Sequence, residues 1–445
     1  MEFAEAVDEI LGRGPGRMIP DLDRITALAE LMGDPEITYP TVHVTGTNGK
    51  GSTVRMVTAL FSAAGLSAGT YTSPHLQTIR ERLSIAGRAI SEDEFAGVYT
   101  GIAPLADMVD EGLAHPEDHV TFFEILTAMA YWWFADSAVD VGVFEVGMGG
   151  QWDATNLVRG EVAVLTDIDL DHPQLGDTPE AIAREKTGIV KDGSHVVSAR
   201  QSDLVLDVIE SAAARHDAPL WVAGRDFAAG DRRVAVGGQQ LSLRVGERRI
   251  DEIFLPLFGR HQAENAAVAL AAFASFLGEE TFANVGDDLV RQAFAAVEAP
   301  GRLEVVARDP VVVLDGAHNP HGAQAAAAAL DESFGFRNLV LVIACLDGKN
   351  IPGIVEAYRD HANHVVVTQA PSHRAASVET MQKIAADVWA GTGVIVETAT
   401  TVADALDKAT GVAGEGDGVL VTGSLYTVGA ARDQLVQMAE ITDDG

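Results

Sequence analysis

Short runs of apolar, mostly β-branched residues recur along the chain and alternate with longer segments of helical spacing. The runs at 41–45, 141–146 and 162–166 have the length and composition of buried strands, whereas 54–64 and 122–134 have the pattern of helices. Strands that are apolar throughout are typical of a parallel sheet that helices cover on both faces. The pattern therefore predicts an α/β fold with a mostly parallel sheet.

The alternation of strands and helices is interrupted once and then starts again. Residues 231–257 contain glycine turns between short alternating segments, which predicts a small antiparallel β insertion. A helical run ends at Pro300, and apolar strands return from Val311. We therefore predict a first α/β domain over residues 1–298 and a smaller, Rossmann-like α/β domain over residues 301–445.

The composition excludes several classes of protein. The 445 residues are 47% hydrophobic, which is enough to build cores and excludes a wholly disordered chain. Cys345 is the only cysteine, so a disulfide scaffold is excluded as well. No segment reaches the about 18 apolar residues of a membrane span, and the N-terminus is acidic where a signal peptide is basic. We expect a cytoplasmic monomer with no membrane partner.

The charge of the chain is strongly negative, with a formal net value of −34. Such a surface repels phosphate backbones, so we do not expect a nucleic-acid partner. Acid-rich and lysine-poor surfaces suit a high-salt cytosol, in which screening removes the self-repulsion. We interpret the charge as an adaptation of the whole surface and not as a binding site. Lysine occurs only at positions 50, 186, 191, 349, 383 and 408.

The strongest local signal for chemistry is a glycine-rich turn between a predicted strand and a predicted helix. Glycines let backbone N–H groups approach a phosphate, Lys50 adds a positive charge, and the following helix presents its positive end. The generic P-loop pattern is not matched, because Val44 stands at the place of its first glycine and Gly51 separates Lys50 from Ser52. A plain glycine turn is the alternative, but the context favours a P-loop mononucleotide-binding domain. The turn consists of Gly46, Thr47, Asn48, Gly49, Lys50, Gly51 and Ser52.

Polar residues at the ends of three further strand candidates predict a site for a nucleotide and a metal ion. Ser73 follows one probable strand, Glu145 lies at the end of another, and residues 167–172 follow the next. A carboxylate at such a place is costly to bury unless a cation meets it, and ligands bind at the carboxyl ends of parallel strands. Taken singly, each has an equal alternative as a turn serine, a solvent-exposed acid or an aspartate-rich loop. Their succession favours one shared site.

Several other residues have patterns that leave two interpretations open. On spacing alone, Lys186 is an ordinary lysine of a helix surface. Arg302 and the run Asp-Gly-Ala-His-Asn-Pro at 315–320 have the charges to hold a zwitterion, or they form a capped loop. The pair Phe122 and Phe123 is more typical of a core than of a stacking platform.

Nine motifs, in one order along nearly the whole chain, resemble the folylpolyglutamate synthase/dihydrofolate synthase family of the Mur ligase superfamily. The glycine after Lys50 resembles this family's own form of the P-loop. The resemblance implies an ATP-dependent amide ligase that uses Mg²⁺ and adds L-glutamate to dihydropteroate, to a reduced folate or to both. The motifs are HVTGTNGKGST (43–53), TSPHL (72–76), EVGMGGQWDATN (145–156), LDHPQLGDT (170–178), REKTGIV (184–190), GRHQAENAAVA (259–269), PGRLEVV (300–306), DGAHNP (315–320) and TGSLYTVG (422–429).

The resemblance also implies roles for residues in the first domain. Lys186 falls at the position of a carbamylated lysine, which reverses the interpretation from its spacing. Phe122 and Phe123 lie near the region that takes the pterin ring. ATP contacts fall on the glycine-rich turn and on Asn265. The implied metal ligands are Ser73, Glu145 and His172.

In the second domain the resemblance assigns residues to the nucleotide, to glutamate and to catalysis. Arg302 and Asp315 fall at ATP-contact positions, and Asp315, His318 and Ser424 fall where the family handles the incoming glutamate. His318 joins Lys50 and Lys186 as an implied catalytic residue.

The implied reaction explains why phosphate, metal and amino-acid sites occur together. A carboxylate is a poor electrophile, so the γ-phosphoryl group of ATP is first transferred to it, and the glutamate amine then displaces phosphate from the acyl phosphate. Because acyl phosphates hydrolyse, we expect closure of the second domain, hinged near Pro300, to exclude water.

Three alternatives remain at this point. A Mur-type ligase that acts on another carboxylate is the nearest, although only about 40 residues precede the P-loop strand and leave little room for a UDP-binding domain. A P-loop switch and a degenerate nucleotide-binding structural protein are the others.

Overall fold

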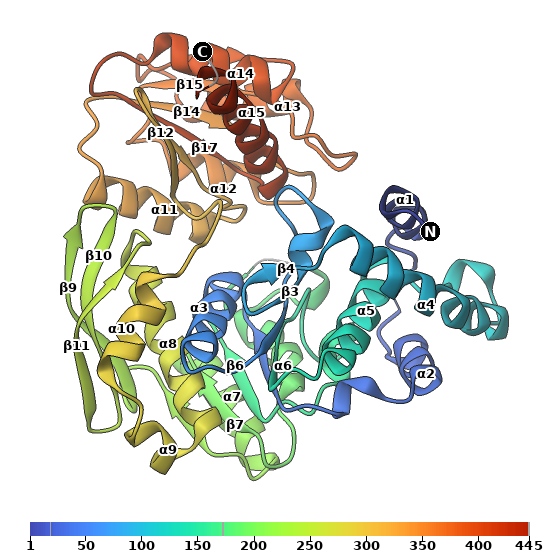
Figure 1. The fold of residues 1–445 in the computed structure, drawn as a ribbon. Helices are drawn as coiled ribbons and strands as arrows, with labels where there is room; N and C mark the ends of the chain where they lie inside the picture. Colours follow the sequence, from blue (N-terminus) through green and yellow to red (C-terminus); the bar gives the residue numbers. More distant parts are fainter. Residues whose placement is uncertain (18, 171–172, 444–445) are drawn as a thin grey trace. The chain divides into compact units, whose positions relative to one another are not determined.

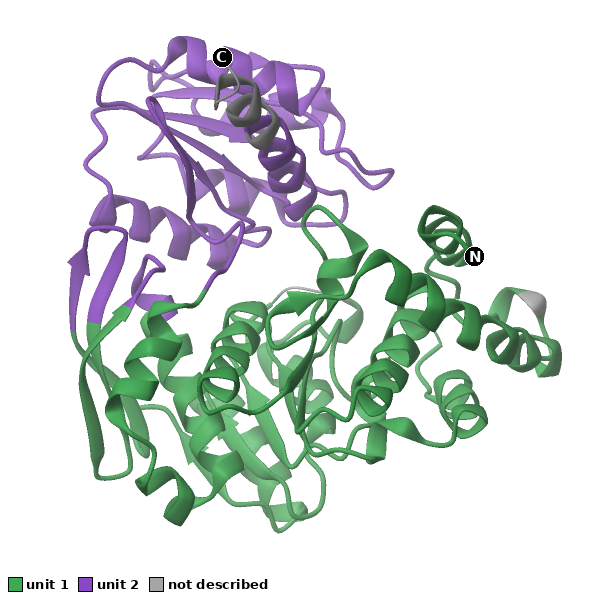
Figure 2. Cartoon of the chain, viewed as in Figure 1, with its two compact units in different colours: residues 1–231, 241–254, 263–297 green, residues 232–240, 255–262, 298–445 purple. Residues whose placement is uncertain are grey.

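The computed structural model describes residues 1–17, 19–170 and 173–443. The chain forms two compact units (Figure 2). The first comprises residues 1–231, 241–254 and 263–297, and the second comprises residues 232–240, 255–262 and 298–445. The single boundary that we predicted near Pro300 therefore does not describe the division fully, because two stretches of the β insertion belong to the second unit. The strands of this insertion are eight or nine residues long, so their two ends lie in different units.

The first unit is built on an eight-stranded sheet that is parallel except at one edge (Figure 1). Strands β2, β5, β1, β6, β7 and β8 pair in parallel, whereas β3 and β4 are antiparallel. This order places β2, β5, β1 and β6 side by side, so their carboxyl ends are neighbours. In spatial order the strands are β4 (Arg88–Ala89), β3 (Leu83–Ile85), β2 (Ala68–Tyr71), β5 (Val141–Glu145), β1 (Thr41–Thr45), β6 (Val162–Leu165), β7 (His195–Ser198) and β8 (Leu220–Val222).

Helices cover this sheet and close its core. The ring of Phe144 on β5 lies 5.5–6.5 Å, between centroids, from the rings of Tyr39, Tyr71, Tyr131 and Phe134, which packs α5 onto the strands. β1 and β5 are buried along their whole length, as the continuous apolar runs predicted. The helices are α1 (Phe3–Arg13), α2 (Asp23–Met32), α3 (Lys50–Ala63), α4 (Glu92–Gly112), α5 (Phe122–Asp136), α6 (Pro179–Lys186), α7 (Asp203–Arg215), α8 (Arg260–Leu277), α9 (Glu279–Ala283) and α10 (Asp287–Ala295).

The β insertion is a three-stranded sheet in the order β11-β10-β9. Two-residue turns at 236–237 and 246–247 join its consecutive strands as hairpins, as the glycines predicted. Its strands are β9 (Phe227–Ala235), β10 (Gly238–Val245) and β11 (Arg248–Leu255).

The second unit has a six-stranded sheet in which only the edge strand β12 is antiparallel. This confirms a second, smaller α/β domain. In spatial order the strands are β12 (Glu304–Arg308), β13 (Val311–Leu314), β17 (Gly418–Thr422), β14 (Leu339–Ile343), β15 (His364–Val367) and β16 (Ile395–Thr398). Its helices are α11 (Pro320–Ser333), α12 (Ile351–Glu356), α13 (Val378–Val388), α14 (Val402–Val412) and α15 (Leu425–Asp443).

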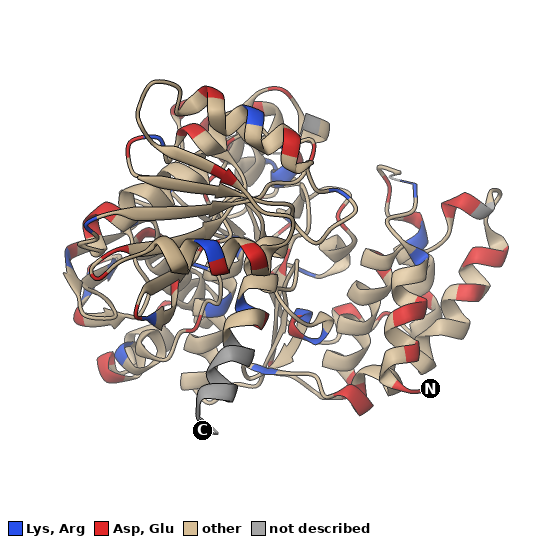
Figure 3. Cartoon of the chain, turned by 90° about the horizontal axis from the view of Figure 1, so that it is seen from above, with Lys and Arg blue, Asp and Glu red and all other residues tan. Residues whose placement is uncertain are grey.

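Acidic residues lie on many of the helices and outnumber the lysines and arginines, 65 against 31 (Figure 3). Among the described residues, no helix is both long enough and apolar enough to cross a membrane.

Candidate active site

The glycine-rich turn leaves β1 and leads into α3, as the sequence predicted. Gly46 has φ of 149°, and a Cβ there would lie 1.8 Å from the Thr166 hydroxyl oxygen. Gly49 has φ of 86° and precedes the first residue of α3, and a Cβ there would lie 2.5 Å from the Asn265 side-chain oxygen. Both positions therefore require glycine, because a side chain is strained at these angles and meets neighbouring atoms.

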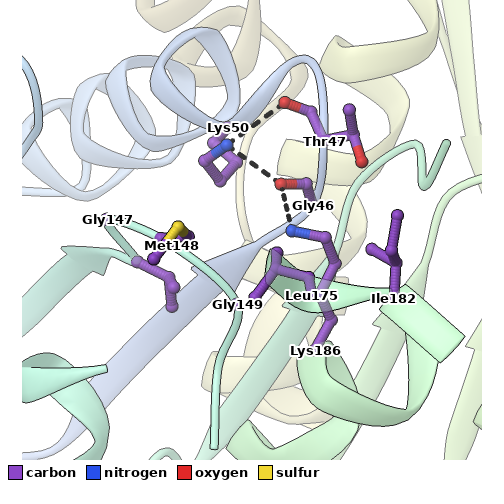
Figure 4. A pocket seen from close by; sticks show the side chains of 10 residues that line it. Gly46, Thr47, Lys50, Gly147, Met148, Gly149, Leu175, Ile182 and Lys186 are labelled. Carbon is purple, nitrogen blue, oxygen red and sulfur yellow. Dashed lines mark hydrogen bonds between the residues drawn. The ribbon is translucent and has the colours of Figure 1, made fainter. Parts of the chain in front are cut away.

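Two lysines meet at the carbonyl oxygen of Gly46 (Figure 4). The Lys50 Nζ donates to this oxygen at 2.9 Å and to the Thr47 carbonyl at 3.2 Å, and the Lys186 Nζ donates to the same Gly46 oxygen at 2.7 Å. Lys186 is the last residue of α6 and is only 4% exposed. Both line a small pocket with Gly46, Thr47, Val146, Gly147, Met148, Gly149, Leu175 and Ile182. Lys186 therefore lies at the site, and its interpretation as an ordinary surface lysine is wrong.

Ser73 and Glu145 lie together at the neighbouring strand ends. Glu145 ends β5 and is 5% exposed, and its Oε2 accepts a hydrogen bond from the Ser73 N–H at 3.2 Å. A Cβ on Gly51 would lie 3.5 Å from the same carboxylate oxygen, so Glu145 faces the first turn of α3. The third predicted metal ligand, His172, lies outside the described residues.

The segment after β6 holds the glycine-rich turn in place. The Asp167 carbonyl oxygen accepts hydrogen bonds from the backbone N–H groups of Thr47, at 2.7 Å, and Asn48, at 3.3 Å. The Thr47 hydroxyl donates to the Asp169 carbonyl at 2.8 Å and accepts from the Asp169 N–H at 3.0 Å. The sequence placed these aspartates near the site, but their backbone contacts depend on the pairing of β1 with β6.

Asp153 organises the loop that follows Glu145, a role that we did not predict from the sequence. Its Oδ2 accepts from the Met148 N–H at 2.9 Å, and its Oδ1 accepts from the Thr155 N–H at 3.0 Å and from the Thr155 hydroxyl. Burial raises the pKa of Asp153, while these hydrogen bonds oppose the shift. An aspartate two residues before a threonine is a turn signal that could have indicated this role.

The first residues of α5 lie beside the same loop. Thr121 and Glu124 form a capping box at this end of the helix. A Cβ on Gly147 would lie 2.5 Å from the Phe123 ring, and the Arg82 guanidinium lies 5.1 Å from the centroid of the Phe122 ring. Both phenylalanines are half-buried, so they are neither wholly core nor wholly exposed.

His75 is neutral and contacts Arg82, the residue that packs on the Phe122 ring. The Arg82 Nε donates to the His75 Nδ1 at 2.9 Å. Burial, with the Arg82 charge, lowers the pKa of His75 to about 4.

The second unit gathers its predicted residues at two adjacent strand ends. Asp315 follows β13, and its N–H donates to the Val421 carbonyl of β17 at 3.0 Å. Its carboxylate accepts from the Leu303 N–H at 3.0 Å and the Ala317 N–H at 2.9 Å. Burial raises the pKa of Asp315, and the Arg302 charge opposes that shift. A Cβ on Gly316 would lie 2.5 Å from the Arg302 Nη1, so the guanidinium packs on this turn.

His318 and Ser424 complete this group. The His318 Nδ1 lies 2.9 Å from the Gly316 carbonyl oxygen. Because that oxygen only accepts, Nδ1 carries the proton and donates. Asn319 caps α11 by accepting from the Gly322 N–H at 2.7 Å. Ser424 follows β17, is 1% exposed and accepts from the Tyr426 N–H at 3.2 Å.

Two family models match the chain: the Mur ligase middle domain over residues 44–273 and the Mur ligase glutamate ligase domain over residues 301–425. The dihydrofolate synthase/folylpolyglutamate synthase of Mycobacterium tuberculosis is 42% identical over 442 residues, which covers 94% of this chain and 90% of that protein. The chain belongs to the dihydrofolate synthase/folylpolyglutamate synthase family. The resemblance seen in the nine motifs is thereby confirmed, and the chain is an ATP-dependent ligase.

Two further comparisons agree with membership in the dihydrofolate synthase/folylpolyglutamate synthase family. The Bacillus subtilis member is 33% identical over 436 residues, with 97% of this chain and 99% of that protein covered. The structure of Mycobacterium tuberculosis folylpolyglutamate synthase complexed with ADP superposes with a TM-score of 0.92 at 40% identity, and covers 97% of this chain and 98% of that one. A Mur-type ligase for another carboxylate is therefore not favoured.

Proposed function

We propose that this protein joins L-glutamate to dihydropteroate, to a reduced folate or to both, at the expense of ATP. The observation that supports this most is the meeting of Lys50 and Lys186 at the Gly46 carbonyl, beside the buried carboxylate of Glu145. In this cluster Lys50 offers positive charge to a triphosphate, whereas Glu145 offers an acidic ligand to a metal at the same sheet edge. Relatives named for both activities match nearly the whole chain.

The nucleotide is assigned to the glycine-rich turn from Gly46 to Ser52. Gly49 packs closely on Asn265, which supports the assignment of Asn265 to the same nucleotide. Arg302 and Asp315 of the second unit are assigned to the same nucleotide. Their charges suit the phosphates and the ribose hydroxyl groups.

Glu145 and Ser73 fit a magnesium ion by their chemistry. Mg²⁺ prefers oxygen ligands, and it commonly uses one or two carboxylates together with the phosphates of its substrate. Glu145 is buried, faces the first turn of α3 and lies within hydrogen-bond distance of Ser73. We assign the ion to these two residues and to His172. When bound, Mg²⁺ would neutralise charge that develops on the transferred phosphoryl group.

The first chemical step brings two anions together. The substrate carboxylate attacks the γ-phosphorus of ATP, and ADP leaves, so that an acyl phosphate forms. Lys50 offsets the repulsion between the carboxylate and the phosphate, because its ammonium group lies on the turn assigned to the phosphates, bonded to the Gly46 and Thr47 carbonyls. The pterin part of the substrate is assigned to the start of α5, where the Phe123 ring packs on Gly147 and the Arg82 guanidinium lies over the Phe122 ring.

The second step requires an uncharged amine. The glutamate nitrogen attacks the acyl carbon, and the tetrahedral intermediate expels phosphate. Since Nδ1 of His318 donates to Gly316, the Nε2 of a neutral ring has a lone pair and can accept the proton that the amine loses. Asp315 and Ser424 are assigned to glutamate at the adjacent strand ends.

Lys186 is assigned a carbamate. Its ammonium group and that of Lys50 share one acceptor in a buried place, where their repulsion is weakly screened. The Lys186 ammonium group would first lose one proton, and addition of CO₂ to the uncharged nitrogen would release a second. A carbamate anion that helps to hold the metal would then replace one of the two positive charges.

The test of this function is direct synthesis. The purified protein is incubated with Mg-ATP and labelled glutamate, and is offered dihydropteroate and tetrahydrofolate separately in high salt. Mass spectrometry then identifies the products. We expect glutamylated product and equimolar ADP with at least one acceptor, and loss of both activities in Lys50→Ala. ATP hydrolysis that proceeds without either acceptor or glutamate would instead support a P-loop switch.

A further inference from the structure

The segment that carries Asp167 is fixed by a side chain that the proposed mechanism does not use. Gln201 lies between β7 and α7, and its carboxamide faces the backbone of residues 166–168. Its Nε2 donates to the Thr166 carbonyl oxygen at 2.9 Å, and its Oε1 accepts from the Ile168 N–H at 3.2 Å. The carboxamide therefore binds the two peptide groups on either side of Asp167.

This contact continues the parallel pairing of β6 and β7. The backbone register of the two strands ends with Leu165 opposite Ser198, and the Ala199 N–H still donates to the Leu165 carbonyl at 2.8 Å. In a parallel ladder, one residue donates to and accepts from the peptide groups that flank a single partner residue. The side chain of Gln201 takes this place opposite Asp167, beyond the last residue of β7.

The other side of Asp167 supports the glycine-rich turn. Its carbonyl oxygen accepts hydrogen bonds from the N–H groups of Thr47 and Asn48. These two residues directly precede Gly49, and α3 begins at Lys50. A shift of Asp167 therefore shifts the turn. We propose that Gln201 is a positioning residue of the nucleotide site, which acts through Asp167 on the backbone of Thr47 and Asn48. The proposal rests on the proposed function only in assigning a nucleotide to this turn.

The decisive variant is Gln201→Met, which keeps the length of the side chain. It removes the two hydrogen bonds to the backbone beside Asp167, together with a long one of 3.5 Å to the Ser198 hydroxyl. We expect it to bind Mg-ADP about tenfold more weakly in isothermal titration calorimetry, since each bond adds a modest share to the position of the turn. In steady-state assays the KM for ATP should rise, and the KM values for glutamate and for the pterin substrate should stay unchanged at saturating ATP. Gln201→Glu, which accepts from Ile168 but cannot donate to Thr166, should also weaken nucleotide binding.

Ser194→Ala is the matched control, because Ser194 braces the same two strands at their opposite ends. Its hydroxyl donates to the carbonyl of Gly160, just before β6, at 2.6 Å and accepts from the Lys191 N–H at 3.1 Å. The control should lower the stability of the fold without changing the affinity for Mg-ADP. If the affinity for Mg-ADP falls equally in Ser194→Ala and Gln201→Met, the cause is a general loss of stability. That result would overturn the proposal.

Hydrogen exchange gives a readout that does not depend on ligase activity. In Gln201→Met the amides of the peptide that covers residues 43–52 should exchange faster than in the unmodified protein and in Ser194→Ala. Unchanged exchange together with unchanged Mg-ADP affinity in both Gln201 variants would refute the positioning role. Failure of the unmodified protein to bind Mg-ADP would refute the proposed nucleotide site itself, which is a different result.

Discussion

Lys50 and Lys186 donate hydrogen bonds to the same atom, the carbonyl oxygen of Gly46, although Lys186 lies 140 positions away from that glycine. Taken alone, each hydrogen bond pairs an ammonium donor with a carbonyl acceptor at an ordinary distance. Together they place two ammonium groups around one buried acceptor, and their mutual repulsion is larger there than in water. This relationship is the structural reason to expect a chemical change at Lys186.

We predict that the activity depends on dissolved CO₂. A carbamate forms from CO₂ and an uncharged amine, so removal of CO₂ and bicarbonate should lower the turnover and their return should restore it. Lys186→Arg cannot form a carbamate and should be inactive in both conditions. Lys191→Arg changes another half-buried lysine, which donates to the Asn156 carbonyl, and should keep the CO₂ dependence. Equal turnover of the unmodified protein with and without CO₂ would show that the carbamate is not needed.

Glu145→Gln should raise the Mg²⁺ concentration needed for activity by at least about tenfold. The amide keeps the shape of the side chain and an oxygen that can accept from the Ser73 N–H, but it removes the charge that attracts the ion. Titration of activity with Mg²⁺ measures the shift. Glu185→Gln, in which a buried carboxylate bonded to the Gln151 N–H is neutralised, is the control and should leave the Mg²⁺ dependence unchanged. Full turnover with unaltered metal binding in Glu145→Gln would remove Glu145 from the metal site.

His43 should make the fold less stable in mild acid. It is fully buried on β1, its Nε2 lies 2.8 Å from the Thr155 hydroxyl, and its Nδ1 has no hydrogen-bond partner among the described residues. Burial, with the Lys191 charge, lowers the pKa of His43 to about 3. The unfolded chain binds this proton near its ordinary value of about 6.5, whereas the folded chain does not, so stability falls as the pH drops below that value.

The expected contribution of His43 is a loss of about 2 kcal/mol between about pH 7 and about pH 5. Urea unfolding at both values measures it. His43→Gln, which has no ionisable ring, should lose less stability over this interval than the unmodified protein. His216→Gln, at a half-buried position beside the exposed Asp192, should resemble the unmodified protein. An identical pH dependence in all three proteins would contradict the assignment to His43.

Removal of Arg24 should cost about 3–5 kcal/mol of stability. Its Nε donates to Glu124 at 3.0 Å, and both side chains are only 8% exposed. Arg24→Met leaves the carboxylate buried without its cation, whereas the double variant Arg24→Met/Glu124→Gln removes both charges and should recover part of the loss. Chemical denaturation gives the values. Arg249→Met is the control and should change little, because the Arg249–Asp251 pair is half exposed. A double variant as unstable as the single one would indicate that packing, not the unpaired charge, explains the loss.

Added KCl should raise the thermal unfolding midpoint from dilute to molar concentration. The net charge is −34, and screening weakens the repulsion among exposed carboxylates. Of the six lysines, only Lys383 and Lys408 are exposed, so the surface has few lysines to offset the acids. A midpoint that falls as KCl increases would contradict adaptation to high salt. A non-binding osmolyte at the same osmotic strength is the control for this measurement. It is excluded from the protein surface as KCl is, but it does not screen charge, so a rise seen only with KCl is due to screening.

The sequence alone determined the parts of this protein whose structure depends on nearby residues. The strand, the glycine-rich turn and the helix around Lys50 were predictable, because backbone freedom at glycine and the spacing of apolar residues act locally. The parallel sheets and the β insertion followed from continuous apolar runs and glycine turns. The order of the motifs identified the family.

Only the tertiary structure decided which of these parts meet. The order β2-β5-β1-β6 brings Ser73 to Glu145, and that order is not the order of the strands in the chain. Lys186 looked like a surface lysine because its partner, Gly46, is remote in sequence. Gln201 had no motif at all, since its role depends on the register of β6 against β7. Such contacts arise from sheet pairing between distant segments, and local patterns carry no information about that pairing.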